Sequence, residues 1–364
     1  MTALHDESLV ADLHNDLILL VDHFDRRGRT DYFGDFWLPE LRAGGVNVQV
    51  LPIFIDEQFQ SEGALRRTLL LIERVHGLAE QYPQLRVCHT GADIARATAD
   101  GRIALVIALE GAHALGQDPA LIRTMERVGV RVVSLAHMGR TLLADGSGVD
   151  DSSCGGLTPQ GLEVLAEMER LGIVFDISHL GVAGVEDVLE HARRPLLATH
   201  SACRAVTDIH RNLTDAQLKG IAALGGVIGV AAAIPPFIDP GRPTAARVVD
   251  HIEHLASVTS LDAIALGPDF IDDYYREVYG GWVIPGMDVT WAESEIRRPS
   301  DLPRITEEMA ERGFADADIK KVLGGNAMRV LDAVMGVPAT AAARTPERAR
   351  TPERASAHEP RSRD

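Results

Sequence analysis

Histidines and carboxylates stand directly after most of the short apolar segments of this 364-residue sequence. The residues in question are His14, Asp16, Glu110, His137, His179, His200 and Asp269. Imidazole and carboxylate groups are the ordinary protein ligands of Zn²⁺ and related ions, and both can move protons during catalysis. These residue types therefore favour a metal site that also performs acid–base chemistry.

The spacing suggests how two ions would be held. Side chains two positions apart in an extended segment share a face, so His14 and Asp16 can hold one ion. His179 and His200 end neighbouring segments and suit a second ion, and Glu110 has two oxygens with which to bridge both. This ligand set predicts two Zn²⁺ per chain, with Mn²⁺, Co²⁺ or Fe²⁺ as substitutes.

The same arrangement predicts a hydrolytic mechanism, and it leaves alternatives open. Two ions about 3.5–4 Å apart would hold a bridging hydroxide, and Asp269 is the candidate to take its proton and pass it to a leaving amine. A single histidine at a strand end is more often a hydrogen-bonded structural residue. Asp12 and Asp176 are either further ligands or residues that orient the ligand imidazoles. His251 and His254, three apart on a predicted helix, are expected on a solvated helix face.

Eight apolar segments alternate with helix-like segments and predict a (β/α)8 barrel. The predicted strands are Val10–Leu13, Val46–Phe54, Ile103–Leu109, Arg131–Ala136, Ile173–Ser178, Leu196–Thr199, Val227–Ala231 and Ala263–Gly267. Helix starts are indicated by Thr158-Pro159, and by Thr214 with Gln217 in a capping box. Because the carboxyl ends of barrel strands converge on one face, the candidate site residues are expected to meet there.

Composition narrows the class of protein. Lys and Arg number 36 and Asp and Glu 53, a formal net charge of −17, which argues against nucleic-acid or anionic-membrane partners. No signal peptide or apolar span is recognisable, so a cytoplasmic location is expected, and the three cysteines are expected to be free thiols. Residues 1–337 are expected to form a single catalytic domain, followed by a low-complexity, disordered tail at 338–364.

Taken in order, the motifs resemble those of the renal (membrane) dipeptidase family of the amidohydrolase superfamily, in a soluble bacterial-type form. The resemblance covers residues 9–335. The matching motifs are His14-Asn15-Asp16, Leu109-Glu110-Gly111-Ala112-His113, Asp176-Ile177-Ser178-His179, His200-Ser201 followed by Arg211-Asn212, and Gly324-Gly325-Asn326-Ala327-Met328-Arg329-Val330.

The resemblance implies a zinc-dependent dipeptidase acting on L,L and L,D dipeptides, with the metal ligands given above. It implies that Asp269 is the acid/base, that His137 polarises the scissile carbonyl and supports the oxyanion, and that Arg211 binds the terminal carboxylate of the dipeptide. His210 and Arg204 are taken as structural or peripheral. The alternatives are a binuclear amidohydrolase acting on N-acyl amino acids or cyclic amides, and a catalytically silent metal-binding barrel.

The sequence also departs from the family pattern, most clearly after the eighth strand. There it reads Gly-Pro-Asp-Phe-Ile-Asp-Asp around Asp269, and Leu13 replaces a common glycine, so a reshaped loop and an altered substrate range are expected. Aromatic residues gather after strands one and eight, and they are expected to form an apolar wall beside the site or a subunit contact in a homo-oligomer. They are Tyr32, Phe33, Phe36, Trp37, Phe270, Tyr274, Tyr275, Tyr279, Trp282 and Trp291.

Overall fold

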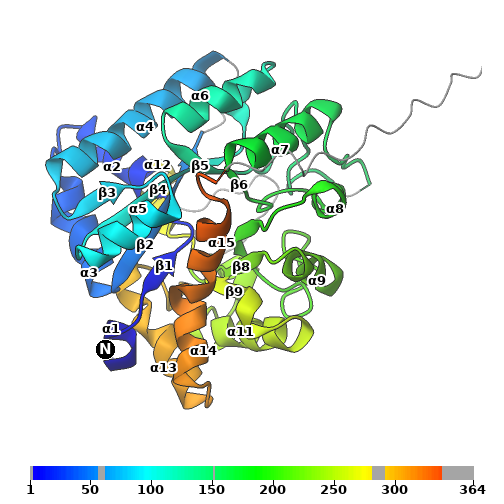
Figure 1. Ribbon diagram of the computed structural model, residues 1–364. Coiled ribbons are helices and arrows are strands. Elements are labelled where there is room, and N and C mark those ends of the chain that lie inside the picture. Colours follow the sequence, from blue (N-terminus) through cyan, green and yellow to red (C-terminus); the bar gives the residue numbers. More distant parts are fainter. Residues whose placement is uncertain (1–2, 56–61, 151, 281–291, 338–364) are drawn as a thin grey trace, which may run out of the picture.

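A computed structural model describes residues 3–55, 62–150, 152–280 and 292–337 (Figure 1). The tail that is expected to be disordered, as well as Trp282 and Trp291, lies outside these ranges. Within the described ranges, no helix combines the length and the apolar character needed to cross a membrane.

Eight parallel strands of the described chain form the barrel that the alternating segments predict. They are β1 (Val10–Asp12), β2 (Val46–Phe54), β4 (Ile103–Glu110), β5 (Val130–Val133), β6 (Val174–Phe175), β7 (Leu197–Ser201), β8 (Val227–Val230) and β9 (Ile264–Leu266). Their order is β6-β5-β4-β2-β1-β9-β8-β7. A parallel bridge between Asp176 and Leu197, with Ile177 N donating to Leu197 O at 2.8 Å, joins the two ends of this order. The (β/α)8 prediction is confirmed.

Two details of the sheet differ from the expectation. A further short strand, β3 (Leu85–Val87), pairs with the start of β4 outside the barrel order. Strands β5 and β6 are also shorter than predicted at their carboxyl ends, because there the chain leaves the sheet and side chains take over the hydrogen bonding. At the end of β6, for example, Asp176 Oδ1 accepts from Ser178 N and Thr199 N, both at 2.9 Å.

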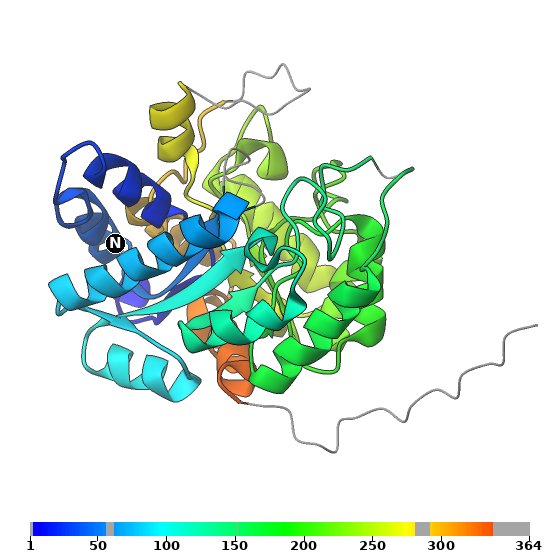
Figure 2. The ribbon, with the colours of Figure 1, turned by 90° about the horizontal axis from the view of Figure 1, so that it is seen from above.

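Helices surround the barrel, as the two ribbon views show (Figures 1 and 2). They are α1 (Ala3–Asp6), α2 (Leu17–Asp25), α3 (Leu38–Ala43), α4 (Glu62–Gln81), α5 (Gly91–Ala99), α6 (Ile122–Arg127), α7 (Pro159–Leu171), α8 (Val182–His191), α9 (Asp215–Ala223), α10 (Pro235–Ile238), α11 (Ala245–Val258), α12 (Asp272–Tyr279), α13 (Pro303–Glu311), α14 (Asp316–Lys320) and α15 (Asn326–Val334). Both predicted helix starts are confirmed. Thr158 Oγ1 accepts from Gly161 N at 3.1 Å at the start of α7, and Thr214 and Gln217 form the capping box of α9.

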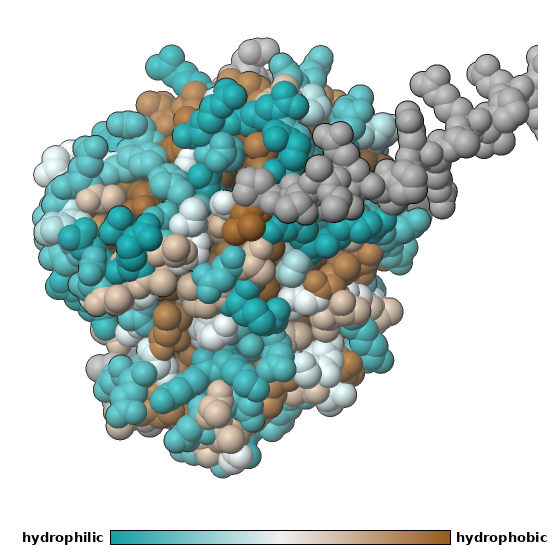
Figure 3. Space-filling model, viewed as in Figure 1, coloured by the Kyte–Doolittle hydropathy of each residue, from teal (hydrophilic) through white to brown (hydrophobic). Residues whose placement is uncertain are grey.

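Helix α15 covers the amino-terminal end of the barrel. Its apolar residues pack with side chains from the strand interiors, such as Ala104 and Val227. Asn326 Nδ2 donates to Leu261 O at 2.7 Å and to Ile264 O at 2.8 Å, at the start of β9. A side chain at Gly324 would meet Leu9 O at 2.4 Å, so glycine permits the close approach of the chain there. In the view of Figure 1, the outer surface mixes hydrophilic side chains with small separate hydrophobic patches (Figure 3).

Candidate metal centre and active site

The predicted site residues meet at the carboxyl end of the barrel, beginning with those after β1. His14 N donates to Asp12 Oδ1 at 2.9 Å, which turns the chain out of the strand. Asn15 Oδ1 then accepts from Leu17 N at 3.0 Å, and α2 begins directly after Asp16. The buried hydrogen bonds of this short segment therefore direct His14 and Asp16 into the barrel mouth.

Two site residues adopt a left-handed backbone. His179 has a φ of 67° and Asp269 a φ of 66°, and they are the non-glycine residues with positive φ in the described part of the chain. This conformation costs energy for residues with a Cβ and persists where the surroundings impose it, often at functional sites. Here Asp269 N donates to His14 O at 3.0 Å, and His179 O accepts from Ser147 N at 2.7 Å.

Glu110, at the end of β4, lies at the centre of the site. Its Oε1 is 3.1 Å from His179 Nε2, 3.4 Å from His14 Nε2 and 3.5 Å from His200 Nε2. His137 Nε2 lies 4.0 Å from the same oxygen. We call these five residues the Glu110 cluster. Four imidazole nitrogens around one carboxylate oxygen place Glu110 where a bridging ligand would stand.

Asp16 and Asp269 adjoin the Glu110 cluster. The structure contains three groups of candidate metal ligands, and within each group the ligand atoms lie within 4.8 Å of one another. The groups are His14 with Asp16 and Asp269, Glu110 with His137 and His179, and His14 with Asp176 and His200. The structure thus brings together all five residues predicted as metal ligands, and it places Asp269 and His137 directly beside them.

Buried polar atoms of the site lack hydrogen bonds. Across the described ranges of the chain, His14 Nε2, His200 Nε2 and Asp16 Oδ1 are buried and make no hydrogen bond. Buried polar groups are normally paired, because leaving one unpaired costs about 1–3 kcal/mol. A cation bound among these nitrogen and oxygen atoms would satisfy them, and the donor set is one that zinc accepts.

The ionisable groups that lie close together in the site also favour a bound cation. Burial raises the pKa of Asp16 well above its usual range, and the charge of Glu110 raises it further. Burial lowers the pKa of His200 well below its usual range, and the charge of His14 adds to that effect. Without a cation these groups therefore cannot all hold their ordinary charges, whereas a divalent ion would favour ionised carboxylates and neutral imidazoles.

Asp269 and His137 have the protonation behaviour that their predicted roles need. Burial raises the pKa of Asp269 to about 7, in the range suited to proton transfer at neutral pH. Burial also lowers the pKa of His137 to about 4, so its imidazole is neutral and can donate one hydrogen bond. The His137 side chain is 20% exposed whereas that of His200 is fully buried, so His137 stands closer to the mouth.

Arg211 is buried beside the site with part of its guanidinium unused. Nη2 donates to His200 O at 2.9 Å, Nη1 donates to Ser201 Oγ at 3.3 Å, and the group lies 4.9 Å from the Phe237 ring centroid. Burial lowers its pKa to about 10, so it remains charged at neutral pH. Its Nε makes no hydrogen bond within the described residues. A buried cation in this condition favours an anionic ligand.

The residues considered peripheral behave in two ways. His210 is exposed and Arg204 pairs with Asp208 at 3.1 Å, as expected of residues outside the site. His251 is not on a solvated face, however, and this prediction was wrong. It is fully buried, its Nδ1 accepts from Cys203 N at 3.1 Å, and its Nε2 lies 3.1 Å from Ile238 O. Helix periodicity did not reveal the packing of α10 over this face.

The two aromatic regions do lie side by side, although not all of their members face an opening. Helix α12 stands next to α2 (Figure 2), and a cavity of about 260 Å³ lies between the regions. Its lining residues are Leu20, Phe24, Tyr32, Phe36, Asp273, Arg276, Glu277 and Arg298. Trp37 and Phe33 are instead buried in the core. Burial raises the pKa of Tyr275, and the charges of Asp16 and Glu110 raise it further.

Sequence reasoning missed the hydroxyl groups behind the histidines. Thr199 Oγ1 lies 3.0 Å from His200 Nδ1 and 3.2 Å from His14 Nδ1, and Ser147 Oγ lies 3.5 Å from His179 Nδ1. A threonine directly before a candidate ligand is a weak signal by itself, because its partners come from other strands.

Comparison with known proteins gives consistent results. Residues 1–345 match the family described as membrane dipeptidase (peptidase family M19). The chain is 32% identical over 281 residues to Dipeptidase verJ of Clonostachys rogersoniana, covering 77% of this chain and 67% of that protein. It is 28% identical over 347 residues to Dipeptidase 3 of Rattus norvegicus, covering 93% of this chain and 67% of that protein.

Solved structures resemble the whole barrel. One is a metallopeptidase from Rhodobacter sphaeroides liganded with a phosphinate mimic of the dipeptide L-Ala-D-Ala, with a TM-score of 0.77 and 25% identity, covering 90% of this chain and 100% of that one. Another is a dipeptidase described as a metallopeptidase of family M19, with a TM-score of 0.78 and 25% identity, covering 91% and 99%.

Proposed function

The chain belongs to the membrane dipeptidase family and is a hydrolase that acts on dipeptides, and we propose that it does so with two zinc ions. His14 and Asp16 would hold one ion, His179 and His200 the other, and Glu110 would bridge them. The observation that carries this proposal is the convergence of four imidazole nitrogens on Glu110 Oε1, at 3.1–4.0 Å, with the Nε2 atoms of His14 and His200 left without hydrogen bonds among the described residues.

The ions, when bound, would polarise the scissile carbonyl and supply a hydroxide nucleophile near neutral pH. The chain's own residues would do the rest. Asp269, with its pKa raised to about 7, accepts a proton from the nucleophile and delivers it to the departing amine. His137, neutral and nearest the mouth, donates a hydrogen bond to the carbonyl oxygen as charge develops on it.

Arg211 would bind the free carboxylate of the dipeptide. Cleavage would then be restricted to the peptide bond that precedes a free carboxyl-terminal residue. Its planar donors suit a carboxylate, and a buried cation without an ion pair among the described residues favours an anionic ligand. We include L,D as well as L,L dipeptides among the substrates. The relative from Rhodobacter sphaeroides, which bound a mimic of L-Ala-D-Ala, supports this choice.

A metal assay combined with a substrate screen tests the proposal. The purified chain is analysed for bound metal and then screened against L,L and L,D dipeptides. The same dipeptides with amidated carboxyl ends, and a set of N-acyl amino acids, serve as controls. We expect about two zinc ions per chain and turnover of free dipeptides. Bound metal with turnover of N-acyl amino acids alone, or with no turnover, would refute dipeptide hydrolysis.

A further inference from the structure

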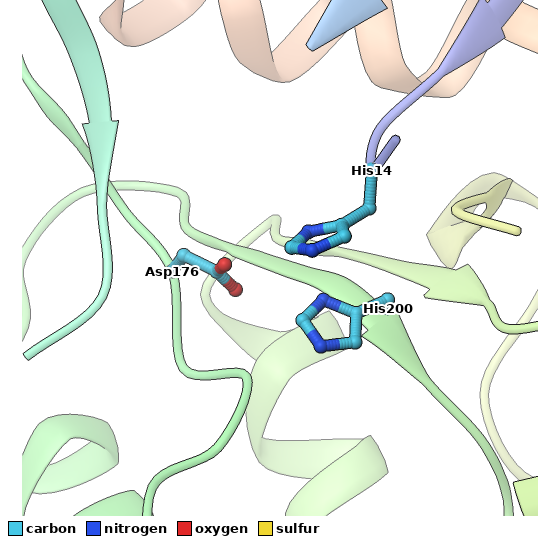
Figure 4. A group of neighbouring side chains, drawn as sticks. All are labelled: His14, Asp176 and His200. Atoms are coloured by element: carbon cyan, nitrogen blue, oxygen red, sulfur yellow. The ribbon is translucent and has the colours of Figure 1, made fainter. Parts of the chain in front are cut away.

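Two members of the Glu110 cluster, His14 and His200, also meet Asp176 in a group that could form another metal site. His14 follows β1, Asp176 follows β6 and His200 lies in β7, yet their candidate ligand atoms lie within 4.8 Å of one another. Figure 4 shows the Asp176 carboxylate directed toward the two imidazole rings. The ring centroids of His14 and His200 are 3.7 Å apart. Either a cation binds among these three residues or something else holds them together.

The hydrogen bonds of Asp176 argue against a cation. Asp176 Oδ1 accepts from Ser178 N and Thr199 N, both at 2.9 Å. Its Oδ2 accepts from Thr199 Oγ1 at 2.6 Å. A carboxylate has about four acceptor positions, so three of them are already filled by fixed protein donors. Asp176 therefore acts as a local acceptor that fixes Thr199.

The hydrogen bonds that the Thr199 hydroxyl can make bear on the tautomers of His14 and His200. A hydroxyl has one proton and two lone pairs. Because the Asp176 carboxylate only accepts, the Thr199 proton is directed to it. The nearest remaining neighbours of Thr199 Oγ1 are His200 Nδ1 at 3.0 Å and His14 Nδ1 at 3.2 Å, while Ser178 Oγ is farther away at 3.3 Å. Thr199 Oγ1 can therefore accept from both Nδ1 atoms, and a neutral ring that donates from Nδ1 has a free lone pair at Nε2.

We propose that Thr199, held by Asp176, is a positioning residue that sets the tautomer of His14 and His200 together and thereby couples the two metal sites. This inference rests on the proposed function, in which these two histidines hold different ions. Their Nε2 atoms are the ones that lie beside Glu110 Oε1, so the tautomer imposed from behind is the one that metal binding needs. His179 has a separate partner, Ser147 Oγ at 3.5 Å, and lies outside this coupling.

Thr199→Val and Thr199→Ser form the matched pair that tests the coupling. Valine keeps the shape and removes the hydroxyl, whereas serine keeps the hydroxyl. Loss of a partner behind a metal ligand weakens metal affinity about 10–100-fold. We expect Thr199→Val to weaken both zinc ions by this factor in competition titrations with a chelator, and Thr199→Ser to stay within about threefold of the unmodified chain. Weakening of one ion alone, or equal weakening by serine, would overturn the proposal.

A second measurement needs no substitution and so does not depend on a variant folding. Two-bond ¹H–¹⁵N correlations on zinc-loaded protein labelled at histidine identify the protonated ring nitrogen. We expect a proton on Nδ1 of His14 and of His200. A proton on Nε2 of either ring would overturn the inference even if the chain binds two zinc ions and hydrolyses dipeptides. Failure of the unmodified chain to bind zinc would instead count against the proposed function.

Discussion

Two buried sites of this protein contain histidines that differ in their hydrogen bonding. In the Glu110 cluster, His14 and His200 each have a buried Nε2 without a hydrogen bond in the described part of the chain, beside a crowded carboxylate. At what we call the His251 site, formed by His251, Cys203 and Ile238, both ring nitrogens have backbone partners at 3.1 Å. His200 and His251 are equally buried, at 0% exposure. Burial and residue type therefore do not separate a candidate metal ligand from a structural histidine, whereas the hydrogen-bond partners of the two ring nitrogens do.

The Glu110 cluster and the His251 site also differ in their effect on the stability of the fold. A satisfied buried histidine stabilises the fold, because its removal leaves backbone groups unpaired. An unsatisfied cluster of imidazoles and carboxylates destabilises the metal-free fold, and bound cations would offset that cost. Substitutions at the site should therefore change chemistry or metal content, and substitutions at the His251 site should change stability alone.

The largest effect is expected at Asp269. Asp269→Asn keeps the shape but removes the group that transfers the proton, and general acid–base catalysis contributes about 10²–10⁴-fold. We expect kcat for dipeptides to fall by that factor while metal content stays unchanged. Steady-state kinetics and metal analysis of the same preparation provide the check. A kcat within about threefold of the unmodified chain would remove Asp269 from this role.

The next effect concerns the buried cation. Arg211→Lys keeps the charge but loses the planar fork, and Arg211→Met removes both. Loss of one partner of a buried, hydrogen-bonded charge pair costs about 2–5 kcal/mol. We therefore expect kcat/KM for free dipeptides to fall at least about thirtyfold in Arg211→Met, with a smaller fall in Arg211→Lys. Dipeptide amides provide the control, and an unchanged preference for the free carboxylate would contradict the assignment.

His251→Leu tests the other half of the comparison. It leaves Cys203 N without its partner, whereas Ile238 O still accepts from Thr207 Oγ1. We therefore expect the free energy of unfolding to fall by about 1–3 kcal/mol, with kcat/KM and metal content unchanged. Denaturant unfolding of folded, assayed protein measures this effect. A loss of metal from this variant would show that the partner inventory does not distinguish the two groups.

The same histidine predicts a pH dependence. Burial lowers the pKa of His251 from its usual 6.5 to about 4, so the unfolded chain binds more protons between these values. Its contribution to stability is therefore present above about pH 6.5 and is lost as the pH falls toward 4. The difference in stability between the unmodified chain and His251→Leu should shrink across this window. A difference independent of pH would contradict the buried, neutral state of this ring.

The smallest effect is expected at the rim of the site. The charges of Asp16 and Glu110 raise the pKa of Tyr275, whereas Trp37 is buried in the core. We expect Tyr275→Ala to change the relative kcat/KM of dipeptides with different side chains by less than about tenfold, a range typical of apolar pocket contacts. Kinetics on a panel of dipeptides measures this change, with Tyr279→Ala, an exposed aromatic neighbour, as the control. Unchanged ratios would exclude Tyr275 from the substrate wall.

The parts of the fold that follow from local pattern could be predicted from the sequence. The mainly apolar segment Val46–Phe54 is β2 to the residue, and Thr214 with Gln217 caps α9 as expected. Site residues could be found because they directly follow such runs, at strand ends that a barrel brings together. Strand β3 could not, because its three residues are stabilised by pairing with β4 rather than by their own pattern.

Features that depend on partners distant in the sequence remained hidden. The burial of His251 results from contacts with Cys203 and Ile238, which lie 48 and 13 residues away. The position of Thr199 behind His14, 185 residues away, appears only when β1 and β7 are placed around the barrel. Periodicity and capping signals describe a residue's own element, and they contain no information about which element packs on it.

Metal stoichiometry of the unmodified chain and of Glu110→Gln tests the central claim most directly. Glutamine keeps the size of Glu110 but removes the charge that would bridge two ions. Elemental analysis after dialysis against trace zinc should give about two zinc ions per chain for the unmodified protein, and a clear loss of zinc together with dipeptide turnover in Glu110→Gln. Equal zinc content in both proteins, or dipeptide turnover that survives complete removal of metal, would contradict the account.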